Sequence, residues 1–257
     1  MKHAFFVILS FLGLGILRAQ SNPQDMHLLS NGLSISGGIG HLAIKDEYIS
    51  RQKYSGTLPS FSMSWLRSDS SSGYKLGMDY FNSSTIRNGN ISADVLLSAL
   101  NLDFLYNVGQ FTMRDYTAYP YLGPSAGIFL YSRQENIATG GNAFFSAYSF
   151  ALFLSLDITS TIVVPISTDW SAEVSGKLGL LSIAGRLADL HDDNVKFFKL
   201  VTLLSGVRGN TQFLIRYDVT NLLQVHAGYR FDICQSATWN YLLAASDNLI
   251  IAITVKM

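Results

Sequence analysis

The stretch Leu223-Gln224-Val225-His226-Ala227-Gly228-Tyr229-Arg230-Phe231-Asp232-Ile233 decides the fold of this chain. Its odd-numbered residues are apolar or aromatic, and its even-numbered residues are polar, charged or glycine. A helix would scatter the polar residues around its axis, whereas successive side chains of a strand point to opposite faces. The stretch therefore predicts a β-strand with one apolar face and one polar face.

The same alternation recurs in both directions from this stretch. It is clearest in residues 33–40, 59–65, 74–80, 152–159, 170–180 and 249–257. Leu152, Leu154 and Leu156, for example, alternate with Phe153, Ser155 and Asp157. The pattern indicates an all-β protein built from repeated amphipathic strands.

The composition indicates where the apolar faces go. Charged residues make up 14% of the chain, against about 25% in soluble domains, and the mean hydropathy is +0.23. No long apolar run follows the N-terminus, so the hydrophobicity must lie in the alternating segments. This is typical of a transmembrane barrel, in which one face of each strand meets lipid. The net charge of zero argues against nucleic acid as a partner.

The connections between the strands predict their number. Short polar turns are expected at residues 68–72, 167–169 and 218–221, and longer polar loops at 45–56, 133–142, 187–199 and 235–248. Between them lie about ten segments of the roughly 9–11 residues that a tilted spanning strand needs. We therefore predict an antiparallel up-and-down transmembrane β-barrel of about ten strands, with eight or twelve as alternatives.

Two other folds compete with this one. Residues 95–108 and 149–166 are apolar enough for helices, but Asp157, Thr159 and Pro165 in the second favour a strand or break a helix. A soluble periplasmic β-sandwich would instead pack the outward apolar faces against one another. Aromatic residues near the expected strand ends favour the barrel, because such rings suit the two membrane interfaces. They are Trp65, Tyr74, Tyr80, Phe81, Tyr106, Tyr119, Tyr121, Tyr131, Trp170, Tyr217 and Tyr229.

The N-terminus has the pattern of a secretory signal peptide. Basic Lys2 and His3 precede an apolar run over residues 4–16, and small Ala19 marks a cleavage point. We expect residues 1–19 to be removed and residues 20–257 to form the barrel in the outer membrane; an uncleaved anchor is the alternative. The single cysteine, Cys234, excludes an intrachain disulfide.

Three segments carry a resemblance to a class of proteins. Residues 119–124 (YPYLGP), residues 227–232 (AGYRFD) and the C-terminal strand, together with Arg18-Ala19-Gln20, resemble small outer-membrane barrel proteins of Bacteroidota-like bacteria. The resemblance implies a Gram-negative cell envelope, outer-membrane lipids as surroundings, and recognition of the C-terminal strand by the barrel-assembly machinery. Met257 stands where the class usually ends in an aromatic residue.

The polar strand faces place charges of both signs in the predicted lumen. The basic ones are Lys75, Lys177, Arg216, Arg230 and Lys256, and the acidic ones are Asp79, Asp103, Asp157, Glu173 and Asp232. Unpaired charge in a narrow lumen is costly, so we expect these groups to neutralise one another. Small barrels are generally filled by side chains, which favours a plugged interior.

Candidate catalytic residues are few. His191, Asp192 and Asp193 follow Asp189 in a predicted outer loop, where a histidine beside carboxylates could activate water or bind a divalent cation. Some outer-membrane proteases are ten-stranded barrels with Asp and His at the outer rim.

A second candidate is His226 on the inner face. Some lipid A-modifying barrels use a His and a Ser on the barrel wall, and here Ser175 or Ser236 could supply the hydroxyl. For either candidate the ordinary alternative is a solvated loop or a hydrogen-bonded wall histidine.

Three functions remain open from the sequence. The favoured one is a plugged, charge-paired barrel with a structural or binding role carried by its loops. A narrow, porin-like pore for small solutes is the second, and a barrel-embedded hydrolase acting on lipid A or peptides is the third. We expect no cofactor and no metal, and no specific protein partner can be named. Because no complete catalytic set is present, a non-enzymatic role is favoured.

Overall fold

The computed structural model describes residues 29, 31–47, 50–69, 71–89, 91–138, 144–189, 196–237 and 241–257. They form twelve strands: β1 (Gly32–Asp46), β2 (Ser50–Ser68), β3 (Ser72–Asn88), β4 (Ile91–Asn107), β5 (Phe111–Met113), β6 (Tyr116–Ala138), β7 (Phe144–Pro165), β8 (Trp170–Asp189), β9 (Lys196–Thr202), β10 (Gly206–Asp218), β11 (Leu223–Ser236) and β12 (Leu242–Lys256). In this part of the chain, no helix is long and apolar enough to cross a membrane. The signal peptide predicted at residues 1–19 lies outside the described residues.

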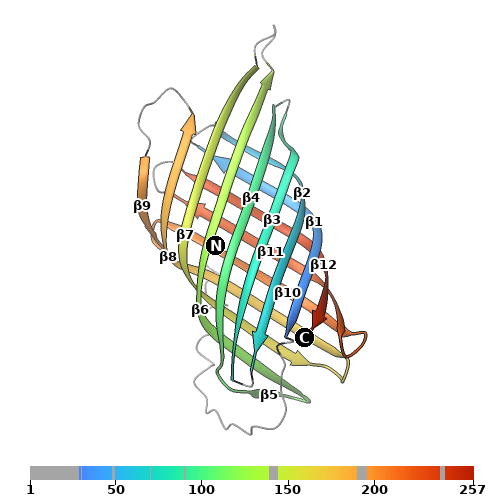
Figure 1. Ribbon diagram of the computed structural model, residues 1–257. Helices are drawn as coiled ribbons and strands as arrows, with labels where there is room; N and C mark the ends of the chain where they lie inside the picture. The colour runs from blue at the N-terminus through green and yellow to red at the C-terminus, as the bar shows by residue number, and fades with distance from the viewer. Residues whose placement is uncertain are drawn as a thin grey trace.

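Ten of the strands form a closed antiparallel barrel (Figure 1). Strands β1 to β4, β6 to β8 and β10 to β12 pair in chain order, and β12 returns to pair with β1 along its whole length. The all-β class, the antiparallel barrel and the expected count of about ten strands are thus confirmed. The two segments considered for helices, residues 95–108 and 149–166, lie mainly in β4 and β7.

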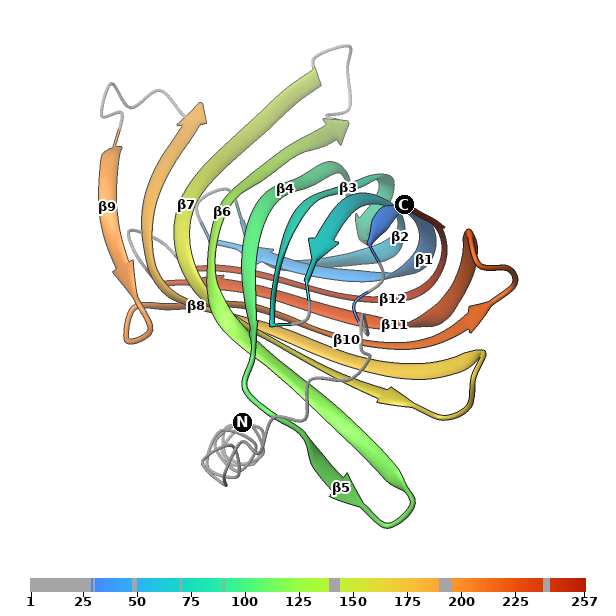
Figure 2. The same cartoon turned by 60° about the horizontal axis from the view of Figure 1, so that its bottom comes forward.

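The two remaining strands are additions to the barrel wall. β5 pairs with the start of β6 in a hairpin that projects from one end (Figure 2). β9 pairs with residues 181–186 of β8, while residues 170–178 of β8 pair with β10. The wall therefore branches at β8: β10 continues it near the short turns, and β9 continues it near the other end.

The barrel strands are longer than the sequence predicted. They range from 13 residues in β10 to 23 residues in β6. Most of residues 45–56, 133–142 and 235–248, predicted as loops, are strand in the structure. The short turns at 68–72, 167–169 and 218–221 are confirmed. We call the end with these turns the turn end and the opposite end the loop end.

The reason for the extra length is visible along β1. Near the turn end, Ile35 and Ile39 point outward and are exposed, and Ser36 points inward. Nearer the loop end, Leu42 and Ile44 point inward and are fully buried. The alternation continues without a break, but the apolar face changes from outside to inside.

Strands β2 to β4 show the same inversion. In β2, Phe61 and Met63 lie outward and exposed, whereas Tyr54 and Leu58 lie inward and buried. In β4, Leu100 and Phe104 are outward, whereas Val95 and Leu97 are inward. On these strands the turn half has the apolar exterior of a membrane barrel. The loop half has the polar exterior and apolar interior of a soluble barrel.

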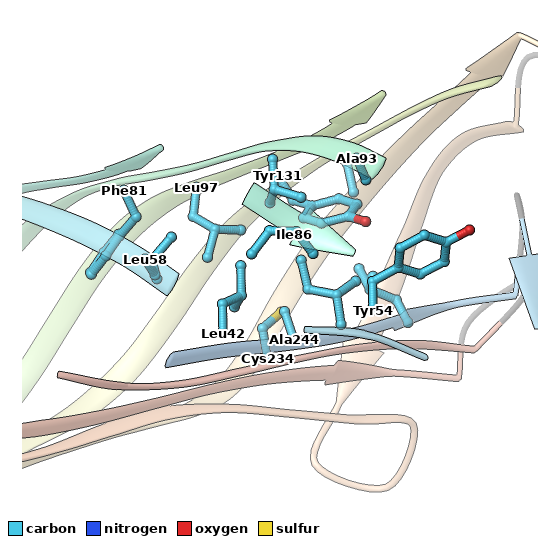
Figure 3. Packing of buried hydrophobic residues seen from close by; sticks show 14 of the residues in the cluster. Leu42, Tyr54, Leu58, Phe81, Ile86, Ala93, Leu97, Tyr131, Cys234 and Ala244 are labelled. Carbon is cyan, nitrogen blue, oxygen red and sulfur yellow. The ribbon is translucent and has the colours of Figure 1, made fainter. Parts of the chain in front are cut away.

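The inward apolar residues of the loop half pack into one cluster, the lumen core (Figure 3). Its buried members are Leu42, Ile44, Tyr54, Leu58, Phe81, Ile86, Ala93, Val95, Leu97, Tyr131, Ala151, Phe153, Ala184, Val201, Cys234, Leu242 and Ala244. They come from strands on all sides of the barrel, so the core crosses the lumen. A smaller cluster of Leu29, Leu105, Tyr119, Tyr121 and Val163 lies near the turn end.

The inward packing corrects part of the expected aromatic girdles. Phe81, Tyr119, Tyr121 and Tyr131 are buried in these two clusters and do not face lipid. The other predicted girdle residues point outward, and two pairs contact each other there: Trp65 with Tyr74, and Trp170 with Tyr217.

Candidate functional site: the charged layer of the lumen

Between the two apolar clusters, the lumen is polar and contains a cavity of about 140 Å³. Serine and threonine side chains contribute much of its wall, among them Ser34, Ser62, Ser64, Thr161 and Thr254. Alternate residues of each strand point into the lumen. In the turn half these inward residues are polar, while the outward residues between them are apolar. The cavity is large enough to hold several water molecules.

Two ion pairs cross this layer from one wall to the other. Arg230 on β11 reaches Asp79 on β3, with nitrogen–oxygen distances of 2.6 and 3.0 Å, and also contacts Asp232 on its own strand at 2.8 Å. Lys177 on β8 reaches Asp103 on β4 at 2.5 Å. Neither β3 and β11 nor β4 and β8 are neighbours in the sheet, so both pairs span the lumen.

Two further pairs lie along the wall. Arg216 pairs with Glu173 on the adjacent strand, and both side chains are buried. At the turn end, Lys256 lies 2.6 Å from Asp218, which also accepts a hydrogen bond from the Gln224 amide. Charge-assisted contacts of this kind are the strong class of hydrogen bond.

The ten charges that we expected in the lumen are distributed as follows. Lys75, Asp79, Asp103, Glu173, Lys177, Arg216 and Arg230 line the cavity of about 140 Å³. Asp157 and Asp232 line a second cavity of about 50 Å³ on the loop side, which shares Asp79, Lys177 and Arg230 with the first. Lys256 lies at the turn end with Asp218.

The sequence reasoning missed a second ionic group, at the loop end. Asp46 on β1 pairs across the lumen with Arg186 on β8 and accepts a hydrogen bond from the Tyr131 hydroxyl at 3.2 Å. Arg133 pairs with Glu135, two positions further along β6. Continuing the strand alternation through the predicted loops would have placed Asp46, Arg133 and Glu135 inward. It would have placed Arg186 outward, because an irregularity at Leu180 and Leu181 reverses the alternation of β8.

Arg208 on β10 was also missed. Its guanidinium lies 2.5 Å from Ser155 Oγ on β7 and 3.3 Å from Asn101 Oδ1 on β4. It crosses the lumen as the ion pairs do, but these partners are uncharged. The glycines in its segment, Gly206 and Gly209, had obscured the alternation.

Of the two candidate catalytic histidines, the structure describes only His226. His226 is buried on the inner face, and its Nε2 lies 3.1 Å from Thr254 Oγ1. Ser175 lines the same cavity as His226, whereas Ser236 lies ten residues along β11, about 33 Å away at the usual rise of a strand. His191, Asp192 and Asp193 lie outside the described residues. The described residues contain no group of three or more His, Cys, Asp or Glu side chains that could hold a metal ion.

Comparison with known proteins adds to this geometry. No protein-family model matches the chain, and no curated protein matches it. Among solved structures, the outer membrane protease OmpT from Escherichia coli has a TM-score of 0.53 at 9% identity, covering 92% of this chain and all of its own. The fold is that of an outer-membrane β-barrel.

Two other solved structures are more distant. The translocator domain of the autotransporter NalP from Neisseria meningitidis has a TM-score of 0.47 at 9% identity, covering 99% of this chain and 98% of its own. Neisserial surface protein A has a TM-score of 0.35 at 13% identity, covering 89% and 99% respectively.

Proposed function

We propose that this chain is an integral protein of a bacterial outer membrane whose lumen is closed by its own side chains, and which acts through its loops. The barrel fold and the apolar exterior of the turn half support this placement. The single observation that supports a closed lumen is the lumen core, which crosses the barrel on the loop-end side of the charged layer. A plug of packed apolar side chains leaves no polar path for ions or solutes.

The ionic side chains support the same conclusion. Ion pairs connect opposite walls of the barrel on both sides of the lumen core. Arg230–Asp79 and Lys177–Asp103 lie toward the turn end, and Asp46–Arg186 lies toward the loop end. A conducting pore needs charged groups that face water and exchange partners with the passing ion. Here most of the charged groups in the lumen are engaged with one another, among them Arg230, Lys177 and Arg216. The role is therefore left to the surfaces outside the lipid, and we propose a structural or binding role carried by the loops.

Ion conductance of the refolded mature chain in a planar bilayer tests this proposal. We expect no current steps, with insertion checked separately by protease protection. The double variant Phe81→Ala, Phe153→Ala removes two aromatic rings from the lumen core and is expected to introduce steps. Discrete steps from the unaltered protein would contradict the closed lumen and leave the narrow pore as the better function.

A further inference from the structure

The cavity of about 140 Å³ has an excess of positive charge. Its lining contains four basic side chains, Lys75, Lys177, Arg216 and Arg230, and three acidic ones, Asp79, Asp103 and Glu173. Each of the three carboxylates is paired: Asp79 with Arg230, Asp103 with Lys177, and Glu173 with Arg216. One cation of the lining is left over.

The remaining cation is Lys75 on β3. Asp103 and Asp79 are the nearest carboxylates, but each is held by another base, and Lys75 forms no ion pair with any residue that the structure describes. Arg216 and Arg230, which line the same cavity, repel the Lys75 ammonium group. Lys75 is the register partner of Asp103 on β4, but it shares that carboxylate with Lys177, so its ammonium group has no carboxylate of its own among the described residues.

The balancing acidic groups face the other cavity. Asp157 and Asp232 line the space of about 50 Å³ on the loop side, together with Arg208. Both carboxylate oxygens of Asp157 are buried without a hydrogen-bond partner among the described residues. The charges of the lumen thus balance as a whole, but the cavity of about 140 Å³, which we call the lower cavity, has a net positive charge. A cation away from bulk water and without a counter-ion is strongly unfavourable.

We propose that the lower cavity binds one small monovalent anion beside Lys75, in the manner of a chloride site. One negative charge neutralises the excess, whereas a dianion would reverse it. The guanidinium of Arg230 is already held by the carboxylates of Asp79 and Asp232, so it cannot provide the bidentate recognition that favours phosphate or carboxylate, and Arg216 is paired with Glu173 through one nitrogen. The Lys75 ammonium group and hydroxyls such as that of Ser64 remain as donors on the cavity wall, and they suit a spherical anion.

Equilibrium unfolding in lipid vesicles, with sodium chloride exchanged for sodium gluconate at constant ionic strength, tests the proposal. An anion that binds only the folded state should raise the folding equilibrium constant about tenfold for each tenfold increase in chloride above its dissociation constant. Lys75→Met should abolish this dependence. Lys53→Met, on the outer face of β2 and away from the cavity, should retain it.

A second measurement does not depend on how well the variants fold. Crystals of the unaltered protein grown in bromide should show one anomalous peak within hydrogen-bonding distance of Lys75 Nζ. Equal chloride dependence in the unaltered protein and Lys75→Met, or a cavity without bromide, would overturn the anion site. Neither result bears on the closed lumen, because the cavity exists whether or not the lumen core blocks conduction.

Discussion

At the scale of single residues, Arg230 does the most to organise the lumen. Its guanidinium contacts Asp79 on the opposite wall and Asp232 on its own strand. It is also the central charge of the segment whose alternation predicted the fold. Inward parity could be predicted for Arg230 from sequence, but its partner could not, because β3 and β11 are more than a hundred residues apart in the chain.

Replacing Arg230 with alanine leaves the buried carboxylate of Asp79 and the half-buried carboxylate of Asp232 without their base. Breaking a buried pair in this way costs about 3–5 kcal/mol of unfolding free energy. Lys45→Ala is the matched control, because Lys45 pairs with Glu47 in an exposed position where loss of the pair costs at most about 1 kcal/mol. Urea unfolding in lipid vesicles measures both; equal costs would show that the lumen pair is not structural.

Asp69 gives a prediction about pH at the turn end. Its Oδ1 accepts hydrogen bonds from the backbone N–H groups of Ser71 at 2.8 Å and Ser72 at 2.7 Å, and these bonds lower the pKa of the carboxyl from its usual 3.8. Because the pKa is lower in the folded state, the stabilisation is present above the unfolded-state pKa and is lost as pH falls through the folded-state value. The difference in unfolding temperature between the native protein and Asp69→Ala should therefore be present at pH 7 and vanish in strong acid. A difference that persists in strong acid would mean that the carboxylate form is not what holds the turn.

At the scale of the strand, the main finding is the inversion of polarity along β1 to β4. The sequence predicted the strands of the turn half correctly, because apolar outward residues alternating with serines and charges match a membrane barrel. It failed in the loop half of β2, where outward residues such as Lys53 and Ser55 gave the segment the composition of a loop. Composition cannot distinguish a polar loop from a strand whose solvent-facing side is polar. The alternation of inward and outward residues, extended from the adjoining strand segment, can.

The inversion predicts a contrast between two outward positions of one strand. Phe61→Arg places a guanidinium in the lipid-facing half of β2 and should cost about 2–4 kcal/mol if the residue lies near the membrane midplane. Ser55→Arg has the same parity but lies in the loop half, where we expect a change within about 0.5 kcal/mol. Both follow from urea unfolding in vesicles. Equal losses would place the whole length of β2 in lipid and contradict the inversion.

At the scale of the whole molecule, the interior is layered along the barrel axis. An apolar cluster lies near the turn end, a charged and hydroxyl-rich layer follows, the lumen core closes the loop half, and the pair of Asp46 with Arg186 lies beyond it. The sequence predicted the charged layer from parity. It did not predict the lumen core. Only Tyr54, Leu242 and Ala244 of that cluster lie in segments predicted as loops; the convergence of the others depends on the change of apolar face along the strands and on the closure of the barrel.

The central claim is that the lumen core closes the barrel, and the only cysteine of the chain tests it most directly. Cys234 is buried in the lumen core beside Leu42 and Ala244 (Figure 3). The measurement is the rate at which a charged, water-soluble thiol reagent modifies Cys234 in the folded, membrane-inserted protein, compared with the variant Ser55→Cys in a Cys234→Ser background. We predict that Cys234 stays unmodified until the protein is unfolded, while the thiol of the comparison variant reacts at once. Rapid modification of Cys234 in the folded barrel would show that water reaches the lumen core and would contradict a closed lumen.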